Sequence, residues 1–443
     1  MFFFSFNSFS GIAAFGEFKN EAGAFFFMGG FALMLADGKI YLPFKNRGFQ
    51  ILLLFIAWCL VCTLLNLPAV IDYWFKRTSG INRFVRQYFS LILSSLIFFS
   101  LYWNVIRQMT LEEVLLKLRK VFFLSLIVAS VYGFFETLYV IFHIGAVKPI
   151  IKLFNYFPFM DVTLGIERIR SIAFEPPWLA IYLITIAGWM FSYIITEKSI
   201  YRFVPSFAIL VLTFFSGSRT GLVVVLVQFG ILLYFLYKSS HYRTLIYRVF
   251  TVLAGFTLLL LVINGEKVIT SVEKKIDSLN FTDNLTKSVS NKSRFGIQIS
   301  SLIVFSENPV SGVGFGQQAF EGHFHYPGWS KRNNWEFDLI YLNPNDPSFP
   351  PGYNMYTRLL AETGIIGIIL YLWLLYYCLR NSILLLKSEN NTIKVLALIL
   401  LISFTGFILN GFQGDTFRLY GFWFSLALLI KMVPYKDNIK RKK

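Results

Sequence analysis

The stretch Phe49–Leu67, FQILLLFIAWCLVCTLLNL, contains 19 residues and no charged side chain. A helix of this length is about 28 Å long, close to the roughly 30 Å thickness of the hydrocarbon core of a membrane. Lipid offers the backbone no hydrogen-bonding partner, so a chain that crosses it must satisfy its own amides and carbonyls as a helix. The stretch therefore predicts a membrane-spanning helix.

Runs of the same kind recur along the chain. Of its 443 residues, 56% are hydrophobic and 15% are charged, whereas a soluble domain carries about 25% charge. We predict an all-α polytopic membrane protein with about eleven transmembrane helices (10–12). The expected spans are 22–36, 49–67, 88–106, 121–144, 177–196, 202–217, 220–237, 247–264, 358–380, 393–412 and 417–434.

These spans divide the chain into three parts. Residues 1–264 carry the N-terminal spans, residues 265–357 form one large loop between the eighth and ninth spans, and residues 358–443 carry the last spans and a basic tail. A loop of this length exceeds an ordinary connection and tends to be functional. The Phe-rich start, Met1–Phe15, has neither a basic region nor a clear cleavage site. We expect an extra half-span or an interfacial helix there, not a signal peptide.

The distribution of lysine and arginine gives the expected orientation. The formal net charge of +17 resides in short loops and the tail, not on one soluble domain, so no nucleic-acid partner is expected. The positive-inside rule puts the tail, residues 436–443, in the cytoplasm, and counting back puts the large loop on the periplasmic side. One loop disagrees, because its basic residues would lie outside: Lys76, Arg77, Arg83 and Arg86.

Two short segments expected on the outer face carry arginine. The segment Glu167–Pro177 precedes a span, and its charges either anchor the helix at the lipid headgroups or face a ligand. The segment Ser216–Gly221 is a tight hairpin whose arginine is costly near hydrocarbon. That arginine either snorkels to the interface or points at an anionic ligand. The charged residues concerned are Arg168, Arg170, Glu175 and Arg219.

A third arginine-bearing segment lies in the large loop. Arg294 opens a moderately amphipathic stretch that leads to PVSGVGFG at 309–316, where Gly312 and Gly314 predict a tight backbone turn. No βαβ unit surrounds these glycines, so they do not form a dinucleotide-binding fingerprint. The aromatic stretch at 325–356 that follows either stacks on sugar rings or forms a compact lid.

Polar and sulfur-containing residues inside the spans are few. Glu136 lies within the fourth expected span, and a membrane-embedded carboxylate is a functional candidate, with one of the arginines as its expected partner. The cysteines Cys59, Cys62 and Cys378 fall in apolar spans, where we interpret them as small buried hydrophobic residues. No Asp-x-Asp or His/Asp pattern has metal-ligand spacing, so we expect neither a metal nor a cofactor.

The ordered set of motifs resembles the O-antigen polymerase and O-antigen ligase superfamily (Wzy/WaaL-like). The likeness covers roughly residues 165–380. It rests on the Arg-x-x-x-x-Glu-Pro segment from Arg170 to Pro176, the Ser-x-Ser-Arg-x-Gly turn at 216–221, and Arg294 followed by NPVSGVGFG at 308–316 and YNMYTRLLAETGIIGI at 353–368.

The resemblance implies an inverting, metal-independent glycosyltransferase in the bacterial inner membrane, with its active site facing the periplasm. The implied donor is an undecaprenyl-diphosphate-linked oligosaccharide, and the other implied partners are membrane lipids and a chain-length-regulating membrane protein. Guanidinium groups suit the negative charge of a leaving diphosphate, so we expect Arg219 and Arg294 to hold it. Glu175 is the expected base, unless it only pairs with Arg170. The other expected substrate contacts are Arg168, Arg170, Glu136, Gly312, Gly314, Tyr353, Asn354 and Arg358.

One departure from the superfamily pattern separates the functional alternatives. Ligases of the superfamily have His-Asn, with a histidine thought to be catalytic, where this chain has Tyr353-Asn354. The departure favours an O-antigen-type polymerase, which joins one lipid-linked repeat unit to another in lipopolysaccharide biosynthesis. The alternatives are a ligase that transfers the glycan to lipid A-core and a transporter that flips lipid-linked oligosaccharides. Transporters usually have internal repeats, and the sequence has none that we detect.

Overall fold

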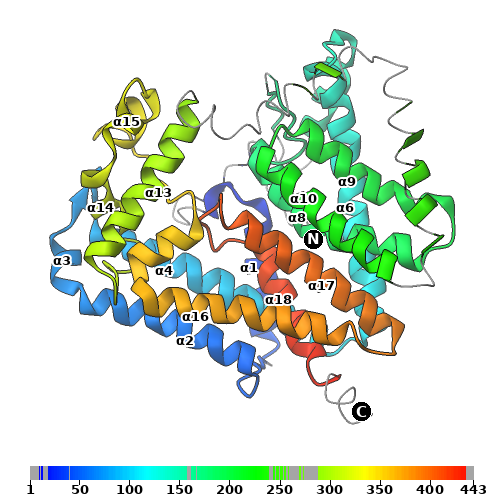
Figure 1. Ribbon diagram of the computed structural model, residues 1–443, viewed down its shortest axis with the longest axis horizontal. Coiled ribbons are helices and arrows are strands. Elements are labelled where there is room, and N and C mark those ends of the chain that lie inside the picture. The colour runs from blue at the N-terminus through cyan, green and yellow to red at the C-terminus, as the bar shows by residue number, and fades with distance from the viewer. Residues whose placement is uncertain are drawn as a thin grey trace.

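The computed structural model describes residues 18–38, 40–156, 161–165, 167–238 and 288–435, together with isolated residues within 9–12 and 243–273. Figure 1 gives the arrangement of its helices. The longer helices are α1 (Ala22–Ala36), α2 (Arg47–Leu65), α4 (Gly80–Ile92), α5 (Phe99–Arg107), α6 (Leu111–Val140), α8 (Pro176–Thr196), α9 (Val204–Phe215), α10 (Arg219–Lys238), α13 (Val289–Glu307), α16 (Met355–Leu385), α17 (Asn391–Asn410) and α18 (Tyr420–Met432).

Short elements connect these helices. The short α-helices are α3 (Leu67–Asp72), α7 (Lys148–Lys152), α14 (Gln318–Gly322) and α15 (Gly328–Lys331). The π-helical segments are η2 (Leu93–Phe98) and η8 (Glu336–Tyr341), and the 3₁₀ segments include η3 (Gly145–Val147), η4 (Leu153–Tyr156), η5 (Ile200–Phe203) and η7 (His323–His325). The strands β1 (Trp74–Phe75) and β2 (Thr78–Ser79) form a small antiparallel hairpin.

The described chain confirms an all-α polytopic membrane protein. Seven of its helices are long and apolar enough to cross a membrane, and three shorter apolar helices accompany them. Together these ten helices correspond to ten of the eleven expected spans. The eighth expected span, 247–264, lies mostly outside the described residues, as do residues 265–287 of the expected loop and the basic tail at 436–443.

Two helices begin earlier than the hydrophobic pattern predicted. The third span begins at Gly80 instead of 88, and the fourth begins at Leu111 instead of 121. Polar residues fill these additional turns, so apolar content alone does not reveal them. At the start of α6, Glu113 N donates to Thr110 Oγ1 at 3.2 Å and Thr110 N donates to Glu113 Oε2 at 2.8 Å, which is a capping box that fixes the first helical turn.

The interior of the bundle is formed around α8. This helix packs against α17, α10, α9 and α6, and its side chains from Leu179 to Ile194 are almost all buried. Its central residue Trp189 contacts Phe122 of α6 and Phe424 of α18, with ring centres 5.3 and 6.0 Å apart. A second set of helices packs around α16. In this set, α2 lies on one side of α16, and α13 lies along the first turns of α16. The cysteines Cys59, Cys62 and Cys378 are buried in this interior as thiols.

Polar contacts gather at the two ends of the bundle. We call the end that holds the first residues of α4, α8, α10, α16 and α18 the site end. In Figure 1, α13, α14 and α15 lie beyond the start of α16 at this end. At the opposite end, Arg119 of α6 pairs with Glu197 at 3.1 Å and Lys431 Nζ donates to Arg107 O at 3.0 Å.

A break in α16 joins the large loop to the bundle. Gly364 has φ 62° inside the helix, so the carbonyls before it lose their helical partners. Residues of the glycine-rich turn replace those partners: Val313 N donates to Ala361 O at 2.9 Å and Gly314 N to Glu362 O at 3.0 Å, while Ile365 N donates to Pro309 O at 2.9 Å. The turn is therefore fastened to α16 through main-chain hydrogen bonds.

Candidate functional site

The first two arginine-bearing segments lie against each other. Ile169 N donates to Phe215 O at 3.3 Å, which pairs the segment before α8 with the last turn of α9. Gly217 has φ 68°, and a Cβ there would approach the side chain of Arg168 to 2.7 Å. The α9–α10 turn therefore requires glycine both for its left-handed backbone and for the space that Arg168 occupies.

The helices that follow these two segments start side by side. A Cβ on Gly221 would lie 2.6 Å from Cβ of Ala180, so α10 and α8 make close contact near their first turns. Ser218 Oγ accepts the amide of Gly221 at 3.1 Å and so satisfies a free N–H group at the start of α10. Arg219 and Glu175 consequently stand at neighbouring helix N-termini.

The third arginine-bearing segment lies on a helix that also reaches the start of α10. Arg294 and Asn291 lie on α13, and Arg219 Nη2 donates to Asn291 Oδ1 at 3.3 Å. The charges of Arg294 and Arg168 both act repulsively on Arg219. We call Arg168, Arg219 and Arg294 the arginine cluster. Three segments that are distant in sequence thus bring three like charges together at the site end, which is an arrangement that favours an anion.

Arg294 also contacts the motif at the start of α16. Its Nη1 donates to Gln413 Oε1 at 2.9 Å, and its guanidinium carbon lies 5.3 Å from the centre of the Tyr353 ring. The Tyr353 hydroxyl hydrogen-bonds to that of Tyr341. Burial raises the pKa of Tyr353, although its bond to Tyr341 and the charge of Arg294 lower it in part. The phenol is therefore protonated at neutral pH.

Glu136 holds the Arg170 segment in place through its backbone. The carboxylate is fully buried in α6. It accepts the single amide of Arg170 on Oε1 at 3.3 Å and Oε2 at 3.2 Å, and the amide of Ser171 on Oε2 at 2.7 Å. The expected arginine partner is thus Arg170, with a hydrogen bond through its main-chain N–H. The Arg170 side chain turns elsewhere, and its Nη1 donates to Phe174 O at 3.2 Å.

Glu175 lies next to Arg170 and is exposed to solvent. The protein atoms around its carboxyl partly desolvate it and raise its pKa above the ordinary value, and the positive charge of Arg170 lowers it in part. The residue immediately precedes α8 but makes no side-chain hydrogen bond to the first amides of that helix. A carboxylate in this position can take up a proton near the arginine cluster.

Four of the expected substrate contacts are occupied by structural interactions. Arg358 is buried, with Nε bonded to Glu362 Oε1 at 3.0 Å and Nη2 to Gln87 Oε1 at 2.9 Å. Asn354 caps α16 by accepting the amides of Tyr356 and Thr357. Gly312 and Gly314 are buried, and a Cβ on Gly312 would lie 2.5 Å from Ala361 O. Gly312 thus permits a close approach to the backbone of α16, and Gly314 donates its amide to Glu362 O of the same helix. Their contact with substrate stays a prediction.

The sequence analysis missed a carboxylate beside Tyr353. Glu336 begins the π-helical segment η8, and its charge acts on both Tyr341 and Tyr353. Its Oε2 atom is buried and has no hydrogen-bond partner among the described residues. Glu336 lies in an aromatic stretch with no recognisable motif, and only its place in space associates it with Arg294.

The described residues contain no group of three or more His, Cys, Asp or Glu side chains that could hold a metal ion. The two loop histidines have local partners. His323 stacks on Phe75 with ring centres 4.3 Å apart, and His325 Nε2 lies 3.3 Å from Glu307 Oε2.

Comparison with known proteins finds a family that part of the chain resembles. A comparison with curated proteins finds no match to the chain. Residues 204–372 match the family model described as O-antigen ligase. The matched region begins with α9 and ends within α16, so it includes Arg219, Arg294 and Tyr353. This match supports the likeness of the chain to the O-antigen polymerase and O-antigen ligase superfamily.

Proposed function

We propose that the protein is an O-antigen-type polysaccharide polymerase that uses an undecaprenyl-diphosphate-linked glycan as donor. The observation that carries the proposal is the arginine cluster: Arg168, Arg219 and Arg294 come from three distant segments and meet at the start of α10. A leaving diphosphate develops negative charge, and pre-positioned guanidinium groups stabilise that charge without reorganising. The proposed site faces the periplasm, and the protein resides in the bacterial inner membrane.

The proposed reaction is a single displacement at the sugar. A hydroxyl oxygen of the acceptor repeat unit forms a bond to C1 of the donor glycan, and the bond from C1 to the diphosphate oxygen breaks with inversion. The electron pair of that bond stays on the diphosphate, which Arg219 and Arg294 hold. The proton of the acceptor hydroxyl passes to a carboxylate. Glu175 is our first choice for this base because it stands beside the start of α10, and Glu336 is the second.

The residue at position 353 favours polymerase over ligase. Tyr353 stands where ligases have a histidine, and its half-buried phenol keeps its proton at neutral pH. It cannot act there as an imidazole base would. The observation that favours ligase, our second candidate, is the description of the matched family model, O-antigen ligase. In that case the acceptor is lipid A-core.

A genetic experiment separates the two activities. In a strain that lacks the gene, a missing polymerase leaves lipid A-core capped with one repeat unit, whereas a missing ligase leaves no capping at all. Complementation with the wild-type gene should restore long chains on a polysaccharide gel. If the null strain shows uncapped core only, the polymerase proposal is wrong and the ligase candidate replaces it.

A further inference from the structure

A second basic cavity lies at the site end, apart from the arginine cluster. It has a volume of about 500 Å³, which is within the range of small-molecule sites. It lies between the start of α4, the start of α16, the turn after α17 and the loop segment 347–351. Its positively charged lining residues are Lys19, Arg83, Arg86, Arg358 and Arg418.

The positive charge of this cavity exceeds the negative charge around it. Among its described lining residues the only carboxylate is Asp415. Two more carboxylates lie behind the wall, where Glu362 pairs with Arg358 and Glu21 pairs with Arg418. Even with these included, cations outnumber carboxylates five to three. A lining with this excess of positive charge favours an anion.

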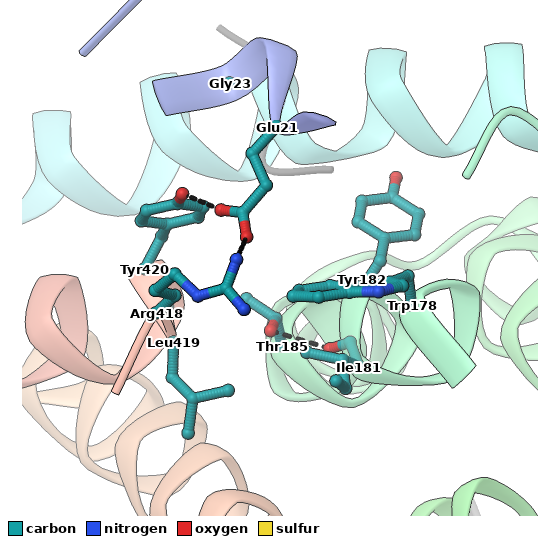
Figure 2. Close-up of a pocket in the computed structure, with 10 residues that line it drawn as sticks. Glu21, Gly23, Trp178, Ile181, Tyr182, Thr185, Arg418, Leu419 and Tyr420 are labelled. Carbon is teal, nitrogen blue, oxygen red and sulfur yellow. Dashed lines mark hydrogen bonds and ion pairs between the residues drawn. The ribbon is translucent and has the colours of Figure 1, made fainter. Parts of the chain in front are cut away.

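The guanidinium of Arg418 is held rigidly at the cavity. Figure 2 shows it pointing at the carboxylate of Glu21, which also accepts the hydroxyl of Tyr420. The same guanidinium lies 5.6 Å from the centre of the Trp178 ring. Because Glu21 precedes α1 and Trp178 belongs to α8, three distant segments fix this one cation.

The part of the large loop that closes one side of the cavity is hydrogen-bonded to the β1–β2 hairpin. Lys76 Nζ donates to Ile340 O and Ser348 O, and Arg77 Nη2 donates to Asn345 Oδ1 at 3.0 Å. Inside the cavity, the guanidinium of Arg83 lies 4.4 Å from the centre of the Phe349 ring. The basic residues that contradicted the positive-inside pattern therefore hold the large loop and line the cavity beneath it.

One turn separates the two basic sites. Gln413 accepts a hydrogen bond from Arg294 of the arginine cluster, and Asp415, two residues later, accepts one from Arg358 through its main-chain oxygen. Asp415 also accepts the amide of Gly352, next to Tyr353. The turn after α17 thus has the arginine cluster on one side and the cavity on the other.

We propose that this cavity binds the phosphate or diphosphate group of the acceptor lipid while the arginine cluster binds that of the donor. This inference rests on the proposed glycosyl transfer, because that reaction brings two lipid-linked glycans together. Arg170, which the sequence offers as a substrate contact, donates from its guanidinium to Phe174 O. Two anionic headgroups on either side of one turn would direct both glycans toward the space near Tyr353.

Binding measurements on the full chain in lipid nanodiscs test the inference without relying on activity. The probe is farnesyl diphosphate, with inorganic diphosphate and farnesol as companions. Wild-type protein should bind two molecules of farnesyl diphosphate and no farnesol. The Arg83→Ala/Arg86→Ala variant should lose one of the two sites, with affinity there weakened at least about tenfold. The Lys331→Ala/Arg332→Ala variant removes two exposed charges outside the cavity and should keep both sites.

The outcomes separate this inference from the proposed function. If Arg83→Ala/Arg86→Ala still binds two molecules at wild-type affinity, the cavity proposal is overturned. If instead Arg219→Ala/Arg294→Ala keeps both sites, the donor clamp fails while the cavity stands. Equal affinity of the cavity for inorganic and farnesyl diphosphate would mean that it takes free diphosphate, which overturns the acceptor-lipid assignment. An unchanged melting temperature, with Arg83→Lys/Arg86→Lys restoring binding, excludes misfolding as the cause of a lost site.

Discussion

The guanidinium of Arg294 lies 5.3 Å from the centre of the Tyr353 ring. This contact joins α13 to the residue that precedes the cap of α16. It places an aromatic ring, where ligases have an imidazole, directly against a member of the arginine cluster. Tyr353 has φ 56°, a backbone conformation that is uncommon for a tyrosine. Its position is thus determined by the surrounding contacts.

Substitutions at Tyr353 show whether its side chain only supports Arg294 or takes part in the reaction itself. Tyr353→Phe keeps the ring under Arg294 and should retain polymer formation to within about tenfold, whereas Tyr353→Ala removes a cation–π contact of about 1 kcal/mol and should lower it further. The measurement is the initial rate of chain extension from a purified lipid-linked repeat unit. Complete loss in Tyr353→Phe would mean that the phenol itself takes part in the reaction.

Replacing a member of the arginine cluster should abolish long-chain product. Arg219→Ala or Arg294→Ala removes a donor to the leaving diphosphate, so we expect a decrease in rate of about 10²–10³. Arg219→Lys should recover little, because an ammonium lacks the two-pronged geometry of a guanidinium. Product length is read on a polysaccharide gel, with Lys331→Ala as the control. Normal long chains in both alanine variants would rule out the clamp.

The pH dependence of the reaction identifies the base. The base must be deprotonated to accept the hydroxyl proton, so the rate should rise as the pH rises through its pKa. Partial desolvation by the surrounding protein raises the pKa of the Glu175 carboxyl, and the rise in rate should therefore occur at a higher pH than for a glutamate free in water. Rates from about pH 4.5 to 8 are compared for the wild type, Glu175→Gln and Glu336→Gln. In the Glu175→Gln variant, the decrease in rate at low pH should disappear. If it disappears only in Glu336→Gln, the second carboxylate is the base.

Glu136 should matter for stability more than for chemistry. Glu136→Ala leaves the buried amides of Arg170 and Ser171 without an acceptor, each at a cost of about 1–3 kcal/mol. Glu136→Gln keeps one acceptor oxygen and should be affected less. Thermal unfolding in detergent gives the stability of both variants. A fully stable Glu136→Ala protein without activity would point to a chemical role.

The orientation can be tested independently of activity. A reporter fused after Lys443 should read as cytoplasmic, and one inserted at the loop residues Lys331 and Arg332 as periplasmic. This result follows from the basic tail and the count of spans. A periplasmic reading after Lys443 would reverse the assigned face of both basic sites.

Sequence predicted the spans well because each one rests on a continuous apolar run. The glycines were less informative. The sequence predicted a turn at 309–316, but it did not predict the break in α16 at Gly364 to which this turn is hydrogen-bonded. Such a break depends on hydrogen bonds between residues about fifty positions apart.

The site was predicted only in part for the same reason. Arg219 and Arg294 stand out in the sequence because each interrupts an apolar or amphipathic stretch, and their role stays a prediction. Glu336, Lys19 and Arg418 were missed, since their neighbours are assembled by contacts across the whole chain. The basic loop at 76–86 gave a usable signal, because charges that violate the orientation rule need another reason to be there.

The main-chain bonds between the glycine-rich turn and α16 determine how the covering loop can open. Lifting the turn would strand the carbonyls of Ala361 and Glu362 and the amide of Ile365, a cost of several kcal/mol without replacement partners. The segment at 345–351 is held instead by the side chains of Lys76 and Arg77, which water can replace. The covering loop can therefore open at the β hairpin while it stays attached to α16. Long glycans would then enter and leave on the side of the β hairpin.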